Sequence, residues 1–326
     1  MKRSLLSLLC CPRCGGGLSL PEARETDERI ETGLLACQAC SRDYPVVRFV
    51  PRFVPAQNYT ASFGIQWKQF RQTQLDSYSG VPVSRQRFFR QTGWSPAALE
   101  GKRILDVGCG AGRFAEIALS CGAEVIAVDY SEAVDACWLN LGHNHGLNVL
   151  QGDLYHLPFK PGSFDFLYCF GVLQHTPDVG AAFAALPPQL GIGGRLAVDI
   201  YPKLFANIFW PKYWLRAWTK RMPAKRLLGL VGQMVPLLLP LSRVVGRIPI
   251  AGRKLRYLIP VANYEGIYPL SESQLREWAV LDTFDMLAPA HDRPQSADTL
   301  RAWFERAGLR EIQIFREGFL VGRAVK

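Results

Sequence analysis

The fold is decided by the stretch Ile104-Leu105-Asp106-Val107-Gly108-Cys109-Gly110-Ala111-Gly112-Arg113-Phe114. An apolar run with a single acid leads into a turn rich in glycine, where a helix is expected to begin. Glycine tolerates positive φ values, and it has no side chain to hold a ligand away from the N–H groups that open a helix. The third glycine comes one residue too early for the dinucleotide pattern G-x-G-x-x-G. We therefore expect a strand, turn and helix that bind a nucleoside or amino-acid moiety against bare backbone.

Acids also follow the next two predicted strands. The first strand ends at Asp129, which lies 23 residues after Asp106, and the second leads to Asp153. A carboxylate at the first place can accept hydrogen bonds from both hydroxyls of a ribose. With these acids, the glycine turn resembles the first motif of the type 11-like class I S-adenosylmethionine-dependent methyltransferases. The resemblance implies S-adenosyl-L-methionine as cofactor, with Asp129 on its ribose and Asp153 on its adenine amino group.

The resemblance extends over residues 100–201 and includes two later segments. Phe164–His175 resembles the family's fourth motif, and Gly193–Ile200 resembles its fifth strand. The fold implied is α/β, a Rossmann-like sheet with helices on both faces. Tyr130 either stacks on the adenine or lies on the surface. The resemblance assigns these residues to the cofactor: Asp106, Gly108, Cys109, Gly110, Gly112, Asp129, Tyr130, Asp153, Leu154 and Phe170.

The start of the chain carries two Cys-x-x-Cys pairs separated by 22 residues, Cys11/Cys14 and Cys37/Cys40. Four thiolates complete a tetrahedral, structural Zn²⁺ site with no open position. Cys10 competes with Cys11, although the C-P-x-C register favours Cys11. This module resembles the small zinc-ribbon proteins that activate tRNA and protein methyltransferases. Thiolate ligands need a reducing compartment, which predicts the cytoplasm.

The first residues, 1–9, are expected to form a strand of this ribbon rather than a signal peptide, because the apolar stretch is short and no cleavage site follows. With 326 residues and 48% hydrophobic composition, the chain can form one α/β domain and accessory modules. In the bridging segment, Phe63, Gln66 and Trp67 either pack in the core or close over the cofactor as a lid. The expected boundaries are a zinc ribbon at 1–55, a bridging or lid segment at 56–100, a methyltransferase domain at 101–202 and 271–326, and a basic, mainly helical insertion at 203–270.

The insertion holds the positive charge of the chain. Between Lys203 and Ala262 there are twelve Lys or Arg and no Asp or Glu, whereas the whole chain carries a net charge of +10. Trp210, Trp214 and Trp218 are four apart, which predicts an interfacial helix. The apolar run at 227–241 is expected to be too short and too broken by proline to span a bilayer.

Three interpretations of this insertion stay open. It is a helical cap whose tryptophans pack on the core, a peripheral contact with an anionic membrane surface through 203–262, or a site for an RNA backbone. The aliphatic run favours lipid over RNA, because phosphate contacts are better served by polar and aromatic groups. The segment 277–285 also resembles bacterial methyltransferases of small-molecule or polysaccharide pathways.

Three functions compete. The first is methyl transfer to a small-molecule or lipid- or glycan-linked acceptor, in the cytoplasm or at the inner membrane surface. The second is methylation of an rRNA or tRNA base, with the ribbon contacting RNA; the sequence at 169–172 lacks the N/D-P-P-Y pattern of amino-methylating enzymes. The third is a cofactor-binding scaffold, which the complete set of acids disfavours. If the acceptor must lose a proton, His175 is the candidate base, although it fits a structural hydrogen-bonding role equally well.

Overall fold

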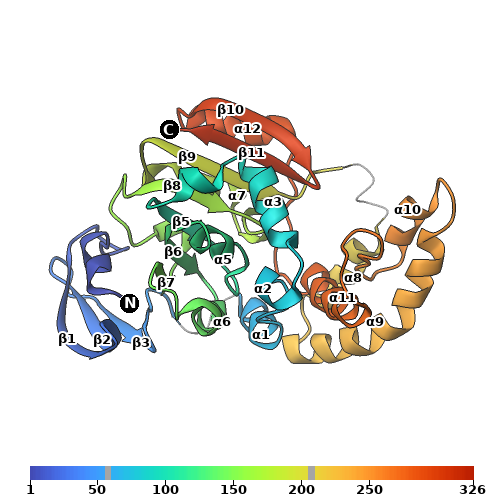
Figure 1. Ribbon diagram of the computed structural model, residues 1–326, viewed down its shortest axis with the longest axis horizontal. Helices are drawn as coiled ribbons and strands as arrows, with labels where there is room; N and C mark the ends of the chain where they lie inside the picture. Colours follow the sequence, from blue (N-terminus) through green and yellow to red (C-terminus); the bar gives the residue numbers. More distant parts are fainter. Residues whose placement is uncertain (56–59, 205–209) are drawn as a thin grey trace.

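The computed structural model describes residues 1–55, 60–204 and 210–326. It consists of a small ribbon domain, a central sheet with helices, and a helical lobe (Figure 1). The ribbon, in blue, lies on one side of the central sheet, and the orange helices of the lobe lie on the other. The two added modules therefore flank the predicted cofactor-binding domain from opposite sides.

The central sheet has seven strands in the order β10-β11-β9-β8-β5-β6-β7. Strands β5 to β9 run parallel to one another, and β11 runs antiparallel to both of its neighbours. The strand order reverses between β5 and β8, which is where open α/β sheets form their ligand crevice. This topology confirms the Rossmann-like fold. The strands are β5 Arg103–Val107, β6 Glu124–Asp129, β7 Leu147–Gln151, β8 Phe164–Cys169, β9 Leu190–Ile200, β10 Arg310–Glu317 and β11 Phe319–Val325.

Helices cover both faces of this sheet because its buried strands are apolar on both sides. Leu105 and Val107 of β5 belong to a hydrophobic cluster with α7 and α12, whereas Ile104 belongs to a second cluster with α3, α5 and α6. Successive residues of a strand point to opposite faces, so one apolar run serves both layers. These helices are α3 Val83–Thr92, α5 Arg113–Leu119, α6 Ala133–Leu141, α7 Val179–Ala184 and α12 Ala297–Arg306.

The ribbon domain is a four-stranded antiparallel sheet preceded by a short 3₁₀ helix. The expectation of a strand over residues 1–9 was wrong, because Arg3–Ser7 forms the 3₁₀ helix η1. A strand of nine residues would extend for about 30 Å. The tighter helix instead brings Met1, Leu5 and Leu9 into the same buried cluster. The strands are β1 Leu18–Thr26, β2 Arg29–Cys37, β3 Asp43–Val47 and β4 Val50–Pro51.

The ribbon docks against the free edge of β7. The backbone N–H of Phe53 donates to the carbonyl of Gln151 at 2.8 Å, and Cys10 donates to the carbonyl of Pro158 at 3.0 Å. Apolar residues of the ribbon and of the central sheet share one hydrophobic cluster. The ribbon therefore covers an edge that would otherwise expose unpaired backbone groups.

The lobe is built from the insertion and from α11. Helix α9 packs on α11 in a separate hydrophobic cluster that includes Leu227, Val231 and Val235. The expectation that proline breaks this run was wrong, because α9 continues through Pro236 and Pro240. Contact with α11 supports it on one side, and it curves in Figure 1, as proline-containing helices do. The lobe contains α8 Pro211–Thr219, α9 Ala224–Gly246, α10 Gly252–Leu255, η6 Arg256–Leu258 and α11 Glu272–Leu287.

Among the described residues, α9 is the one helix that is long and apolar enough to cross a membrane by length and composition. Its most apolar window has a mean hydropathy of 1.6, and 28% of that window is buried. The core helix of a water-soluble domain can pass the same test. Length and hydropathy therefore leave open whether α9 meets lipid.

Helix α8 turns its polar side toward the end of α11. Arg216 is 6% exposed and donates to the carbonyls of Met286 at 3.0 Å and Pro289 at 2.8 Å. Trp214 and Trp218 are 67% and 81% exposed. The interpretation that these two tryptophans pack on the core was therefore wrong. The end of α11 presents backbone carbonyls that need donors, and Arg216 supplies them, which sets the rotation of α8.

Candidate active site

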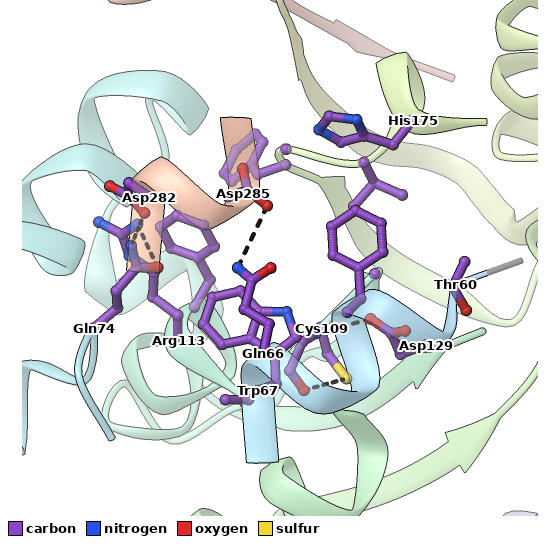
Figure 2. A pocket seen from close by; sticks show the side chains of 18 of the residues that line it. Thr60, Gln66, Trp67, Gln74, Cys109, Arg113, Asp129, His175, Asp282 and Asp285 are labelled. Atoms are coloured by element: carbon purple, nitrogen blue, oxygen red, sulfur yellow. Dashed lines mark hydrogen bonds between the residues drawn. The ribbon is translucent and has the colours of Figure 1, made fainter. Parts of the chain in front are cut away.

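A cavity of about 520 Å³ opens at the carboxyl ends of β5, β6, β7 and β8. Its floor comes from the turns after these strands, and its other walls come from the bridging segment and the lobe. The bridging segment contributes α1, which spans Ala61–Gln69. In Figure 2, Cys109 and Asp129 lie across the cavity from Asp282 and Asp285 of α11. The cavity thus joins a strand-end half to a lobe half.

The glycine turn has positive φ at all three glycines, with values of 81° at Gly108, 52° at Gly110 and 93° at Gly112. A Cβ on Gly108 would lie 2.1 Å from Cγ2 of Val172, and a Cβ on Gly112 would lie 2.6 Å from a leucine of α6. At Gly110 the neighbour is the Trp67 ring, at 3.2 Å. Close packing inside the protein therefore requires Gly108 and Gly112, in addition to any approach by a ligand.

Asp129 is fixed by three hydrogen bonds at the end of β6. One carboxylate oxygen accepts from the N–H of Gly110 at 3.0 Å, and the other accepts from the N–H and the hydroxyl of Ser131 at 2.8 and 2.7 Å. Burial raises the pKa of this carboxyl group, and these hydrogen bonds oppose the rise. Carboxylate oxygens have further lone pairs, so the group can still accept from a ribose.

Asp153 and Tyr130 line the neighbouring part of the cavity. Asp153 accepts from the N–H of Tyr155 at 2.9 Å and lies 3.1 Å from Nδ1 of His156, which fixes its carboxylate at the start of the 3₁₀ helix Leu154–His156. Burial raises the pKa of Tyr130, and the charge of Asp153 raises it further. Tyr130 lines the cavity and is partly exposed.

Eight of the ten cofactor residues expected from the sequence line this cavity: Gly108, Cys109, Gly110, Asp129, Tyr130, Asp153, Leu154 and Phe170. The other two, Asp106 and Gly112, do not line the cavity. Asp106 is 2% exposed, and burial raises its pKa to about 8, although the neighbouring hydroxyl of Tyr168 opposes the rise. Gly112 caps α5 and packs against α6. Both residues are buried, and neither faces the cavity.

Helix α1 covers the glycine turn from above. Phe63, Gln66 and Trp67 all line the cavity, so this helix lies over the site. Nε2 of Gln66 donates to Asp285 at 3.4 Å, which connects the lid to the lobe (Figure 2). The sequence left open whether these residues pack in the core or cover the cofactor, and the structure has them over the cavity.

His175 is buried at the cavity wall, and its ring packs 5.6 Å from Phe63 and 5.5 Å from Tyr201. Its Nδ1 lies 2.9 Å from the backbone carbonyl of His291. A carbonyl can only accept, so Nδ1 must carry the hydrogen and the neutral ring keeps a lone pair on Nε2. The tautomer thus follows from the hydrogen bond, and it suits a proton acceptor.

The lobe half contains a charged network that the sequence did not predict. Asp282 accepts from the hydroxyl of Tyr264 and from Nε2 of Gln74, at 3.2 Å in the latter case. Gln74 in turn accepts from Arg113 at 3.0 Å (Figure 2). Burial raises the pKa of Asp282 to about 6; the Tyr264 hydrogen bond lowers it and the charge of Asp285 raises it. The sequence signal for this network was the spacing of Asp282 and Asp285, which are three residues apart and so lie on one face of α11.

The remainder of the lobe half is aromatic. Lys212 of α8 is half-buried beside aromatic rings, with Nζ at 4.8 Å from the Tyr213 ring and 5.3 Å from the Tyr201 ring, and burial lowers its pKa. These contacts are cation–π interactions, which favour the protonated amine. The aromatic residues lining this half are Tyr257, Tyr264, Tyr268 and Trp278 from the lobe, together with Tyr201 after β9 and Phe319 at the start of β11.

The four predicted metal ligands come together in the ribbon. Their Sγ atoms lie within 4.8 Å of one another, with Cys11–Cys40 at 3.7 Å and Cys14–Cys37 at 3.5 Å. Tetrahedral zinc with bonds of about 2.3 Å separates its sulfur ligands by about 3.8 Å. Cys10 lies outside this cluster, as the C-P-x-C register indicates. The four thiols therefore fit zinc in both number and spacing.

Two segments of the chain match known protein families. Residues 105–198 match the family described as a methyltransferase domain, and residues 2–48 match the family described as Trm112p-like protein. The ubiquinone biosynthesis O-methyltransferase of Thiobacillus denitrificans is 36% identical over 102 residues, which cover 30% of this chain and 44% of the relative. The demethylmenaquinone methyltransferase of Thermobifida fusca is 34% identical over 122 residues, covering 36% and 52%.

The chain spans about half the length of the curated relatives it matches. Among solved structures, the complex of the Haloferax volcanii Trm112 methyltransferase activator with a methyltransferase has a TM-score of 0.47 and 12% identity, covering 83% of this chain and 97% of that chain. By the two family matches, residues 105–198 belong to a methyltransferase domain, and a Trm112p-like domain precedes it.

Proposed function

We propose that this protein transfers a methyl group from S-adenosylmethionine to a small-molecule acceptor. The observation that carries the proposal is the single cavity that joins the strand-end half to the aromatic lobe half. The strand-end half presents glycine backbone and fixed carboxylates, which suit a nucleoside, and the lobe half leaves room for a second molecule. The quinone-pathway relatives support a small acceptor.

The residues present fit the cofactor. Asp129 would hold the ribose, Asp153 and Tyr130 would hold the adenine, and the backbone of Gly108 and Gly110 would receive the amino-acid part. When bound, the cofactor supplies a methyl group on a sulfonium that already carries its leaving group. The protein then has to align the acceptor and exclude water, and such positioning accounts for about 7–11 kcal/mol of a barrier. Phe63 and Trp67 of α1 cover this half and suit that role.

We assign proton removal to His175. Its Nε2 is the free acceptor of the neutral ring because Nδ1 is held by the carbonyl of His291. A positioned base of this kind contributes about 10²–10⁴-fold to a rate when the acceptor is a hydroxyl. An acceptor that is already nucleophilic would not need it.

The aromatic lining favours an apolar or ring-bearing acceptor. Rings such as Tyr264, Tyr268 and Trp278 stack on flat or hydrophobic groups. One relative is named for ubiquinone biosynthesis and the other for demethylmenaquinone, and both names refer to ring-bearing, lipid-soluble compounds. A lipid-linked molecule fits this lining, and a glycan-linked one fits through stacking on a sugar face. We further propose that the four ribbon cysteines hold a structural zinc ion and that the protein works in a reducing, cytoplasmic compartment.

A direct test is incubation with radiolabelled S-adenosylmethionine and separated small-molecule, lipid and RNA extracts, after calorimetry has measured cofactor binding. We expect label in the small-molecule or lipid fraction. His175→Gln is expected to lower kcat by about 10²–10⁴-fold with unchanged cofactor Kd, and high pH is expected to restore part of the rate. His145→Gln, at an exposed loop, is the matched control. Absence of cofactor binding would contradict the proposal.

The second candidate is methylation of an RNA base, favoured by the Trm112p-like match and the net charge of +10. RNA binding weakens steeply with salt because counterions are released, whereas binding of a neutral small acceptor barely responds. Label confined to the RNA fraction would favour this candidate. Cofactor binding without label in any fraction would indicate a scaffold.

A further inference from the structure

We propose that α8 and the adjoining η6 turn form a docking surface for an anionic lipid bilayer, which sets the cavity mouth at the level of the lipid headgroups. The inference rests on the proposed function, because its purpose is to bring a lipid-linked acceptor to the aromatic half of the cavity. It also places the protein at the inner face of the cytoplasmic membrane.

The first observation is the rotation of α8. A helix on a water-soluble lobe normally turns its apolar side inward. Here the inward side carries Arg216 and Thr219, which donate to backbone carbonyls of the lobe. Trp214 and Trp218, one turn apart, face outward instead. Their rings are the amphipathic groups that settle at a membrane interface.

The second observation is that this aromatic surface begins at the cavity. Trp210 stacks on Tyr257 of η6 at 5.6 Å, and Tyr257 both lines the cavity and is half exposed. Trp214 and Trp218 continue the row at intervals of four residues along α8. We call these four rings the aromatic stripe. The stripe thus leads from the exposed face of α8 to the cavity.

The third observation is where apolar side chains are exposed. Among the described residues, thirteen of the seventeen large exposed hydrophobic side chains belong to the insertion. The other four, which include Leu139 and Ile192, are scattered over the remaining domains. Single exposed apolar residues are ordinary, whereas a concentration on one lobe marks an interaction surface. The thirteen are Trp214, Leu215, Trp218, Leu230, Leu237, Leu241, Val244, Ile248, Ile250, Leu255, Tyr257, Leu258 and Ile267.

The fourth observation is charge, which selects lipid as the occupant. Lys220 and Arg221, at the end of α8, and Lys225 and Arg226, in the first turn of α9, are exposed directly after the stripe. No acid occurs between Lys203 and Ala262 to neutralise them. Cations beside tryptophan match an anionic headgroup layer above an apolar interior. A long aliphatic surface adds nothing to the binding of an RNA backbone.

The test uses the full-length, zinc-loaded protein and co-sedimentation with vesicles of phosphatidylglycerol or of phosphatidylcholine. We expect binding to phosphatidylglycerol vesicles that weakens with salt. Trp214→Ala/Trp218→Ala is expected to lower partitioning by at least about tenfold. Lys220→Glu/Arg221→Glu is expected to lower it by about 30-fold or more. The matched controls are Leu139→Ala/Ile192→Ala and Lys102→Glu/Arg301→Glu, which change exposed residues outside the lobe and are expected to bind as wild type.

Tryptophan fluorescence gives a second measurement, because entry into the interface shifts the emission to shorter wavelength, and the double tryptophan variant is expected to lose that shift. Equal binding to both lipids, or wild-type binding by the lobe variants, would overturn the proposal. Binding to single-stranded RNA without binding to vesicles would also overturn it and would favour a nucleic-acid surface. Cofactor calorimetry on the same variants is expected to be unchanged, so failure of docking is distinct from failure of the proposed function.

Discussion

Replacing Gly108 by alanine separates two reasons for the glycine turn. The backbone there has a φ of 81°, and an added Cβ would lie 2.1 Å from Cγ2 of Val172. The left-handed conformation costs a residue with a Cβ about 1–2 kcal/mol. Overpacking against Val172 costs a further amount of about 1–3 kcal/mol. We therefore expect Gly108→Ala to lower the free energy of unfolding by about 2–5 kcal/mol.

Val172→Ala supplies the second side of a double-mutant cycle. It removes both γ-carbons and leaves the Val172 Cβ at 3.1 Å from the new Cβ, which is a tight but tolerable contact. In that background Gly108→Ala is expected to cost only the backbone term, about 1–2 kcal/mol. The coupling energy between the two substitutions is then about 1–3 kcal/mol, a size that such cycles resolve.

Urea denaturation measures the four stabilities, and calorimetry measures S-adenosylmethionine binding to each variant. Zero coupling would refute the reasoning from packing. If stability recovered in the double variant while cofactor affinity stayed low, the glycine would serve mainly the approach of the ligand. If both stability and cofactor affinity recovered, the glycine at position 108 would be required mainly because the Val172 side chain packs against it.

Three further outcomes are expected. Chelation, or Cys14→Ser, should lower the thermal unfolding midpoint, with recovery of the chelated protein on adding Zn²⁺ but not Mg²⁺, because a structural site contributes folding energy. Arg52→Ala should cost roughly 3 kcal/mol in urea unfolding and weaken cofactor binding in calorimetry, because it leaves the Asp135 carboxylate, 16% exposed and 2.5 Å from Arg52, without this partner. The pKa of Asp282 is raised to about 6 in the folded protein. The stability that the protonated carboxyl group contributes is therefore fully present below the unfolded pKa and is lost as the pH rises through the folded pKa of about 6. Asp282→Asn should therefore gain roughly 2–3 kcal/mol over wild type above pH 7 and nothing below pH 4 in urea unfolding.

The strand-end half of the site could be predicted because its signals are local. In parallel strands the carboxyl ends meet at one edge, so Asp129 and Asp153 had to lie near the glycine turn once their strands were recognised. The two Cys-x-x-Cys pairs carry their geometry within four residues each, which is why the ribbon cluster was also foreseen. The sequence did not reveal that Asp106 is buried away from the cavity lining, because a strand position does not state which way the side chain turns.

The lobe half could not be predicted because it depends on contacts between distant segments. Gln74 and Asp282 are 208 residues apart, and no local pattern pairs them. Helix α8 shows the same limit, since its spacing predicts a two-sided helix without stating which side faces in. Carbonyls of Met286 and Pro289 decide that question by accepting from Arg216. Hydrogen bonds from Arg216 to the carbonyls at the end of α11 therefore determine the orientation of α8, and Trp214 and Trp218 stay exposed.

The two added modules support opposite ends of one cavity. From the ribbon, Arg52 reaches Gln151 at 3.1 Å, and Gln151 donates to the carbonyl of Tyr130 at 3.1 Å, beside the proposed adenine site. The lobe instead supplies Lys212 and Tyr257 to the aromatic half. Damage to the ribbon is therefore expected to appear in the Kd of the cofactor, and damage to the lobe in the KM of the acceptor. A ribbon variant that raised the acceptor KM alone would contradict this division, because no direct contact of the ribbon with the aromatic half is seen among the described residues.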